Sequence, residues 1–180
     1  MQESDKPLYH GSDIVIVAPE LDFKKKTDSD FGKGFYCSVS YDQAERWALE
    51  KWESSENEYA AVSFYKLEKI PSSFKILKFD GPTLEWIRFV KRNRKDFLFD
   101  HEYDIVIGPI ADNNLKRLFK LEEEGIITEE ELRSKAYKSD LKDQFLFHTE
   151  RAKKLLTFLS AIEVKKINNK ILRREWIQKK

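Results

Sequence analysis

The sequence predicts an α+β fold, in which strands and helices are mixed along the chain without the strict alternation of a doubly wound parallel sheet. Segments rich in β-branched and aromatic residues, of which residues 59–67 are the clearest, are interspersed with segments whose apolar residues recur at helical spacing. The sequence contains no internal repeat, linker or low-complexity tract. Because 180 residues are enough to bury a substantial core, we expect a single domain over residues 1–180.

In the first half of the chain, β-branched and aromatic runs predict the strands. These runs cover residues 8–17 (broken around Gly11 and Ser12), 35–39, 59–67 and 75–79, with a charged loop over 21–30. Ser40 is a suitable N-cap for a helix that continues to about Trp52. One face of this helix carries Ala44, Trp47, Ala48 and Lys51.

In the second half, capping residues mark most of the helix starts. Pro82 is expected in the first turn of a helix that ends near Arg94. Asp112 or Asn113 can cap a helix through Glu124, and the capping box of residues 128–131 opens another. The remaining predictions are strands over 103–107, 143–149 and 160–167, a helix over 150–159, and a basic helix or tail over 168–180.

Charge and cysteine content exclude several classes of protein. Lysine plus arginine (33) nearly balances aspartate plus glutamate (32), so net charge gives no argument for nucleic-acid or membrane binding. The single cysteine, Cys37, lies in an apolar run and is expected in the core, and the three histidines lack metal-ligand spacing. Neither a signal peptide nor an apolar run of about 20 residues is present, so we expect a cytoplasmic protein without a membrane segment.

Two short segments combine glycine with residues that can carry chemistry. Residues 8–12 (Leu-Tyr-His-Gly-Ser) place His10 directly before a glycine, and residues 31–36 (Phe-Gly-Lys-Gly-Phe-Tyr) deliver Tyr36 after a glycine-containing turn. Glycine at such places lets the backbone approach a turn partner or a ligand closely. Each segment alone fits a loop-to-strand junction, whereas the pair favours a ligand site.

These two segments resemble motifs of the diphtheria-toxin and poly-ADP-ribose-polymerase branch of the ADP-ribosyltransferases. The first resembles that branch's His-Gly-Ser/Thr strand, and the second its Gly-Lys-Gly-aromatic-Tyr-Phe motif. The whole chain is similar to a bacterial domain family of formerly unknown function (DUF3990) that is assigned to the same clan. The marks of that family are Tyr-Asp-x-Val-x-Gly-Pro-x-Ala at residues 103–111 and Gln-x-x-Phe-His-Thr at residues 144–149.

The resemblance implies a split β-sheet core with peripheral helices and NAD as the co-substrate of a glycosyltransferase. It implies a catalytic triad of His10, Tyr36 and Gln144. The residues expected to bind NAD are His10, Gly11, Ser12, Tyr36, Ala44 and Trp47. In this arrangement His10 and the backbone of Gly11 hold the ribose and the nicotinamide amide. Tyr36 and Trp47 sandwich the nicotinamide ring, with Ala44 leaving room for it.

Gln144 stands where the polymerising branch has a glutamate. A glutamine can accept a hydrogen bond from the ribose but cannot act as a general base. We therefore expect transfer of a single ADP-ribose to a macromolecular acceptor, protein or nucleic acid. The resemblance to the family implies a toxin or defence setting. Asp143 and Glu150 are candidate substitutes for the base, although Asp143 points away from Gln144 on a strand.

Two alternatives remain open from the residues alone. The first is a catalytically silent module that binds NAD or ADP-ribose. The second is a docking protein whose basic end contacts a nucleic acid or an antitoxin-like neutralising partner. Of the other histidines, His101 is expected on the surface or in a cap. His148 shares a strand face with Gln144, where it either lines the cleft or is a core histidine.

Overall fold

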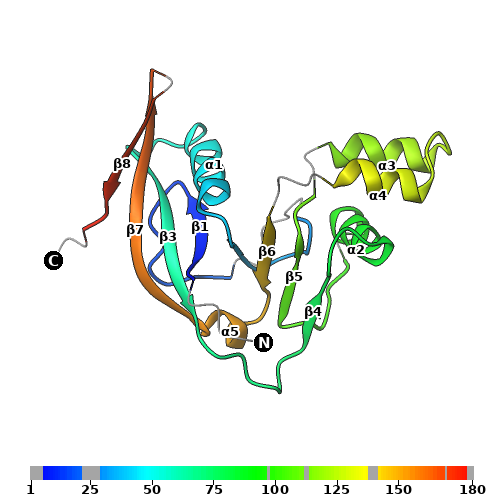
Figure 1. Cartoon of the computed structure of the whole chain (residues 1–180), viewed down its shortest axis with the longest axis horizontal. Coiled ribbons are helices and arrows are strands. Elements are labelled where there is room, and N and C mark those ends of the chain that lie inside the picture. The colour runs from blue at the N-terminus through cyan, green and yellow to red at the C-terminus, as the bar shows by residue number, and fades with distance from the viewer. Residues whose placement is uncertain are drawn as a thin grey trace. The chain divides into compact units, whose positions relative to one another are not determined.

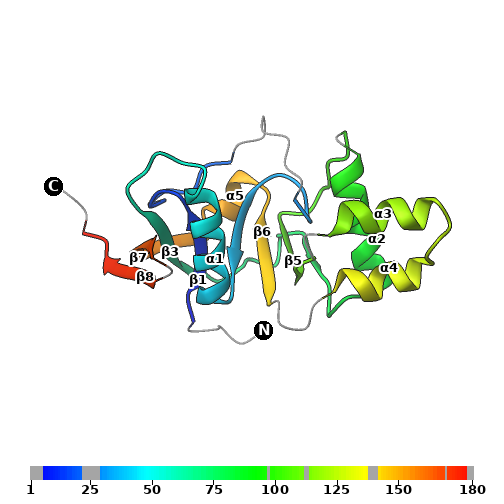
Figure 2. The same ribbon diagram turned by 90° about the horizontal axis from the view of Figure 1, so that it is seen from above.

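The computed structural model describes residues 6–21, 29–96, 98–111, 114–137, 142–168 and 170–177, and these residues form the mixed α+β structure that the sequence predicts. Their contacts divide the chain into two compact units, each assembled from separate stretches (Figures 1 and 2). The first unit contains residues 1–20, 36–72 and 153–180, and the second contains residues 21–35 and 73–152. The single domain expected over residues 1–180 stays a prediction.

The first unit is built on an antiparallel sheet in the order β2-β1-β3-β7-β8. Its strands are β1 (Leu8–Ser12), β2 (Phe35–Ser38, of which residues 36–38 lie in this unit), β3 (Ala60–Leu67), β7 (Leu156–Ile167) and β8 (Lys170–Glu175). Helix α1 (Tyr41–Trp52) packs on one face through Ala44, Ala48 and Leu49. The Ser40 side chain accepts from the Gln43 backbone N–H, so the predicted N-cap is confirmed.

The second unit combines a short sheet with most of the helices. Parallel strands β4 (Ile76–Lys78) and β5 (Ile105–Pro109) are followed by β6 (Asp143–Phe147), which pairs antiparallel with β5. Its helices are α2 (Leu84–Lys95), α3 (Leu115–Glu123), α4 (Glu129–Ala136) and most of α5 (Glu150–Lys153). Trp86 of α2 is fully buried, and its indole N–H donates to the Pro109 carbonyl at 2.9 Å.

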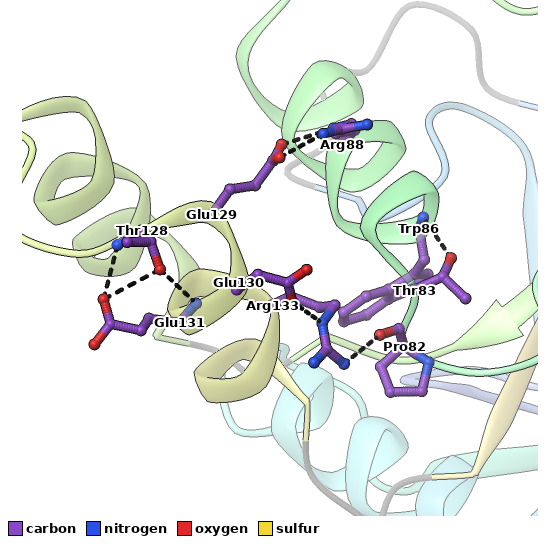
Figure 3. Close-up of polar contacts among 9 residues, drawn as sticks. All are labelled: Pro82, Thr83, Trp86, Arg88, Thr128, Glu129, Glu130, Glu131 and Arg133. Carbon is purple, nitrogen blue, oxygen red and sulfur yellow. Dashed lines mark hydrogen bonds and ion pairs between the residues drawn. The ribbon is translucent and has the colours of Figure 1, made fainter.

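Polar contacts join helices α2 and α4 and close the start of α4 (Figure 3). The Arg88 guanidinium donates two hydrogen bonds to the Glu129 carboxylate, at 2.8 and 2.6 Å. The predicted capping box is confirmed, because the Thr128 side chain and the Glu131 backbone, and the Glu131 side chain and the Thr128 backbone, bond reciprocally. Such an arrangement satisfies N–H groups that a helix start otherwise leaves unpaired.

Three predicted elements are wrong. Residues 14–17 form no strand: the Ile16 N–H donates to the Ser63 hydroxyl, and the Tyr65 hydroxyl donates to the Ile16 carbonyl. Pro82 precedes the helix instead of entering it, because Thr83 is the N-cap. The helix predicted over 150–159 stops at Lys153, where the chain leaves α5 for the long strand β7.

The basic C-terminal segment is the fourth correction, because it forms a strand and not a helix or tail. β8 pairs antiparallel with β7, with Arg173 opposite Val164. The Arg173 guanidinium donates to both carboxylate oxygens of Glu45 on α1, at 2.6 and 2.7 Å. Glu45 is buried and also accepts from the Tyr41 hydroxyl, whose pKa is raised to about 12 by burial and by this carboxylate. β8 therefore fastens α1 to the sheet.

Two further placements complete the comparison with the sequence. Cys37 is fully buried, as predicted, and burial raises the pKa of its thiol. Asp112 and Asn113, the expected caps of α3, lie outside the described residues, and the described N-cap is Asn114.

Replacing Arg173 with methionine is expected to lower the free energy of unfolding by about 1–2 kcal/mol, because the buried Glu45 carboxylate loses its charged partner. Urea denaturation of the variant and the wild type measures this loss. Arg174→Met is the matched control: its carboxylate partner, Glu163, is more accessible than Glu45, so a smaller loss is expected. Equal losses in the two variants would contradict the anchoring role of Arg173.

Candidate functional site

The structure brings His10 and Tyr36 together on neighbouring strands of the first unit. His10 Nδ1 lies 2.6 Å from the Tyr36 carbonyl oxygen. Because a carbonyl can only accept, Nδ1 carries the proton and donates. The pKa of His10 is lowered from its ordinary value to about 3, first by burial and then by the charge of Lys51, against the opposing effect of the Tyr36 hydrogen bond. His10 is thus a neutral imidazole at pH 7 with Nε2 as an acceptor.

Gly11 is a glycine because α1 packs directly on it. A Cβ atom at this position would lie 1.9 Å from the Ala44 carbonyl oxygen and 2.9 Å from the Ala48 nitrogen. The Gly11 carbonyl also accepts a hydrogen bond from the Lys51 ammonium at 2.9 Å. Strand alternation places Gly11 on the face covered by α1 and His10 on the opposite face, so the two residues address different sides of the sheet.

The other predicted NAD-binding residues of the first unit differ in accessibility. Tyr36 on β2 and Trp47 on α1 are half-buried, so part of each side chain reaches solvent. Ala44 is fully buried, and its contact with Gly11 explains its small size. Ser12 is buried and its hydroxyl donates to the neighbouring Asp13 carboxylate at 3.1 Å. None of these contacts identifies a ligand by itself.

Gln144 belongs to the second unit, where its side chain is 4% exposed on β6. Its amide nitrogen donates to the Asp30 carboxylate at 2.8 Å. Asp30 also accepts from the Ala111 N–H at 2.9 Å and forms an ion pair with Arg94. The neighbouring Asp143 is exposed, as strand alternation predicts.

The Asp30 contact determines what Gln144 can do. An ionised carboxylate only accepts hydrogen bonds, so it fixes the Gln144 amide with its nitrogen toward Asp30. The amide oxygen is then the group that can accept a hydrogen bond from a hydroxyl. A glutamate at position 144 would instead place a second carboxylate about 3 Å from Asp30, and two carboxylates that close cannot both ionise without a large cost. The local electrostatics therefore favour the amide.

The family-like segments of the second unit also bind one another. The Asp104 carboxylate accepts from the Thr149 hydroxyl at 2.7 Å and from the Arg151 guanidinium, and the His148 N–H donates to the Asp104 carbonyl. The Arg151 guanidinium, the Thr149 hydroxyl and the Lys75 N–H lower the pKa of the Asp104 carboxyl to about 2, the bond from Arg151 being the largest cause. Asp104 thus joins residues 103–111 to residues 144–149, as expected for a residue with a structural role.

The remaining histidines are core residues of the second unit. His101 is 8% exposed, so its predicted surface position is wrong; the aromatic rings of Phe89 and Tyr103 pack around it. His101 Nε2 lies 2.8 Å from the Phe31 carbonyl, and His148 Nδ1 lies 2.7 Å from the Lys33 carbonyl. His148 is therefore the core histidine that the sequence left as one of two possibilities.

Sequence reasoning missed Asp30 and Arg94 and gave Lys51 no role at the site. Asp30 ends a charged run in which nothing distinguishes it from its neighbours, and its partners lie 64 to 114 positions away. Lys51 could have been found, because it shares a helix face with Ala44 and Ala48.

The family model described as "Protein of unknown function (DUF3990)" matches residues 7–158, and the chain therefore belongs to this family. Neither a curated protein nor a solved structure matches the chain.

Metal-ligand clusters and membrane-spanning helices are both absent from the described residues. No group of three or more histidine, cysteine, aspartate or glutamate side chains suitable for a metal ion occurs among them. Likewise, no helix in this part of the chain has the length and apolar character to cross a membrane.

Gln144→Glu is expected to destabilise the protein at pH 7 by roughly 1–3 kcal/mol and to recover as the pH falls. The pKa of a carboxyl facing Asp30 is raised in the folded state, so folding binds a proton and stability falls as pH rises through and above the ordinary carboxyl range. Denaturation between pH 4 and 8 measures this. Gln144→Met is the control, since it loses the hydrogen bond without adding a charge. A loss for Gln144→Glu that does not depend on pH would contradict the explanation.

The lowered pKa of His10 predicts an imidazole that stays neutral across the physiological range. Nuclear magnetic resonance titration of the imidazole protons should show no midpoint above pH 5 for His10. Lys51→Met removes the second cause of the shift and is expected to move the midpoint upward. An ordinary midpoint near pH 6.5 in the wild type would contradict the lowered pKa of His10.

Proposed function

We propose that this protein is an NAD-dependent mono-ADP-ribosyltransferase that acts on a macromolecular acceptor. The observation that carries the proposal is the bond from His10 Nδ1 to the Tyr36 carbonyl, because it links the two segments that resemble ADP-ribosyltransferase motifs. In this reaction the bond between nicotinamide and C1′ of the ribose breaks, and nicotinamide leaves with the bonding electrons. An acceptor nucleophile then bonds to C1′ and releases its proton.

His10 suits the ribose side of this chemistry. With Nδ1 donating to Tyr36, its Nε2 accepts, and a ribose hydroxyl is a matching donor. Breaking the glycosidic bond builds positive charge on the ribose, as in glycoside hydrolysis. A neutral imidazole does not add a second positive charge beside it, whereas an imidazolium would oppose the transition state.

The ring of nicotinamide requires aromatic faces and a carboxamide partner. Tyr36 and Trp47, both half-buried, supply the aromatic faces in the proposal. Gly11 supplies the backbone carbonyl, which a carboxamide N–H would share with the Lys51 ammonium. Ser12, next to Gly11 in sequence, belongs to the proposed NAD-binding set, and the fully buried Ala44 supports that set by packing against Gly11.

Gln144 in this proposal accepts a hydrogen bond from the ribose 2′-hydroxyl through its amide oxygen. The amide cannot remove a proton from the acceptor, so the acceptor either needs no deprotonation or brings its own base. This limits the reaction to a single transfer and gives no route to chain elongation. Asp30 behind the amide supports this function by fixing which end of the amide is the acceptor.

The hydrogen bond from the Gln144 amide to Asp30 also favours a second candidate, a module that binds NAD or ADP-ribose without turnover. An uncharged residue whose amide nitrogen is held by a buried carboxylate positions a ribose without activating an acceptor. Calorimetry discriminates the two candidates. Binding of NAD without release of nicotinamide favours the module, whereas turnover favours the transferase.

The transferase proposal predicts that labelled NAD, incubated with the protein and a bacterial lysate, labels a macromolecule and releases nicotinamide. His10→Asn is expected to lower kcat/KM roughly 10- to 100-fold, because asparagine can replace the Nδ1 donor to Tyr36 but has no counterpart of Nε2. The control is Lys120→Ala at an exposed position on α3 in the second unit, which should behave as the wild type. Absence of both products, or equal activity of His10→Asn and the wild type, would contradict the proposal.

A further inference from the structure

Two imidazoles of the second unit form a close pair. His101 lies ahead of β5, and His148 follows β6, with ring centroids 4.2 Å apart and planes inclined at 41°. Both side chains are more than nine-tenths buried. Two histidines in such surroundings require hydrogen-bond partners, because a buried polar group without one is costly.

Each imidazole holds a different carbonyl of the same turn. His101 Nε2 donates to the Phe31 carbonyl, and His148 Nδ1 donates to the Lys33 carbonyl. His101 Nε2 and His148 Nδ1 must therefore each carry a proton, because a carbonyl oxygen can only accept. The two histidines therefore fix two alternate peptide groups of the Phe31–Gly34 turn.

The tautomer of His101 has a cost that a merely space-filling residue would avoid. With Nε2 protonated, Nδ1 is an acceptor. Among the described residues, it is the one buried side-chain nitrogen or oxygen that has no hydrogen-bond partner. Burial among aromatic rings lowers the pKa of His101, which keeps it neutral. A phenylalanine would fill this aromatic cluster without the penalty but would leave the Phe31 carbonyl without its donor.

His148 is held through its backbone as well. Its backbone N–H donates to the Asp104 carbonyl at 2.9 Å, and its Nε2 lies 3.1 Å from the Asp100 carboxylate, a distance that is an ion pair only when both ring nitrogens carry a proton. Ring, backbone and turn are thus fixed relative to one another. The His148 imidazole therefore has a fixed orientation, with its Nδ1 N–H directed at the Lys33 carbonyl.

The turn itself fits closely against the same elements. Gly34 has φ +144°, and a Cβ atom there would lie 2.6 Å from the Phe147 carbonyl and 3.1 Å from the His148 Cα. Gly32 has φ +93°, where a Cβ atom would lie 2.6 Å from the Asn93 side-chain oxygen. Only glycine combines these dihedral angles with this spacing, so the close approach of the turn to Phe147 and Asn93 requires glycine at both positions.

We propose that His101 and His148 are positioning residues that clamp the Phe31–Gly34 turn and thereby set the backbone from which Tyr36 follows two residues later. The inference rests on the proposed function, because Tyr36 is the residue whose position it explains. The clamp acts through the chain: Gly34 is held, Phe35 is buried, and Tyr36 then offers its carbonyl to His10.

The test compares variants that keep the donor with variants that remove it. Asparagine at position 148 places an N–H near the site of Nδ1, and glutamine at position 101 places one near the site of Nε2. His148→Ala and His101→Phe remove the donors, the second while keeping an aromatic ring. If His148→Ala does not fold, His148→Gln replaces it, because its donor lies one bond further out and overshoots the Lys33 carbonyl.

Amide hydrogen exchange of residues 32–36, measured without NAD, reports on the turn. Donor removal is expected to speed exchange there about tenfold, because losing one hydrogen bond raises the opening equilibrium constant about tenfold. His148→Asn and His101→Gln are expected to stay within about threefold of the wild-type exchange rate. With NAD, donor removal should lower kcat about tenfold and the donor-keeping variants should restore it. A purely structural role would lower the thermal midpoint without this selective rescue.

Unchanged exchange in His101→Phe and His148→Ala, or equal losses in the donor-keeping and donor-removing variants, would overturn the clamp. The exchange measurement separates this inference from the proposed function. A wild type that neither binds nor consumes NAD refutes the function while the exchange data still decide the clamp. A wild type that consumes NAD, with exchange indifferent to the donors, refutes the clamp alone.

Discussion

The buried carboxylate of Asp30 is the contact on which the second unit depends. It receives the Gln144 amide from β6, the Ala111 N–H that follows β5, and the Arg94 guanidinium from α2. A buried charge is tolerated only when such donors replace the water it has lost. Because Asp30 directly precedes Phe31, the same residue fixes where the histidine-clamped turn begins. Removing the carboxylate would leave three separate segments without their common acceptor.

This constraint changes the meaning of the glutamine at position 144. Considered alone, Gln144 is an enzyme's glutamate that has lost its charge. Beside Asp30 it is the residue that the local charge requires, since the amide donates where a second carboxylate would repel. The negative charge of this region lies on Asp30, where Arg94 neutralises it, and Gln144 presents an uncharged oxygen. In the proposed function, binding a ribose and activating an acceptor are therefore different requirements, and Gln144 meets only the first.

Sequence patterns predicted the elements whose local signals agree with their tertiary contacts. Residues 60–67 are mostly apolar, with Val62 and two aromatic residues, and form a central strand. Ser40 and Thr128 cap helices as their side-chain chemistry requires. β8 escaped prediction because all six of its residues are exposed and four are charged, a composition that suits a helix unless a partner strand is known. Residues 14–17 failed for the opposite reason: their β-branched side chains suit a strand, but side chains of β3 satisfy the backbone. Asp30 could not be found, because its significance lies in partners distant in sequence.

Two separate networks therefore underlie the residues that resemble an ADP-ribosyltransferase site. In the first unit, burial and the charge of Lys51 keep His10 neutral, and the Tyr36 carbonyl orients it. In the second, Asp30, His101 and His148 hold the turn that leads into Tyr36. The peptide between Phe35 and Tyr36 links the networks covalently within β2. A change in the second network can therefore reach His10 through the main chain alone. In the proposed function the turn matters beside the histidine, because it leads into the Tyr36 carbonyl, which determines the nitrogen of His10 that carries the proton.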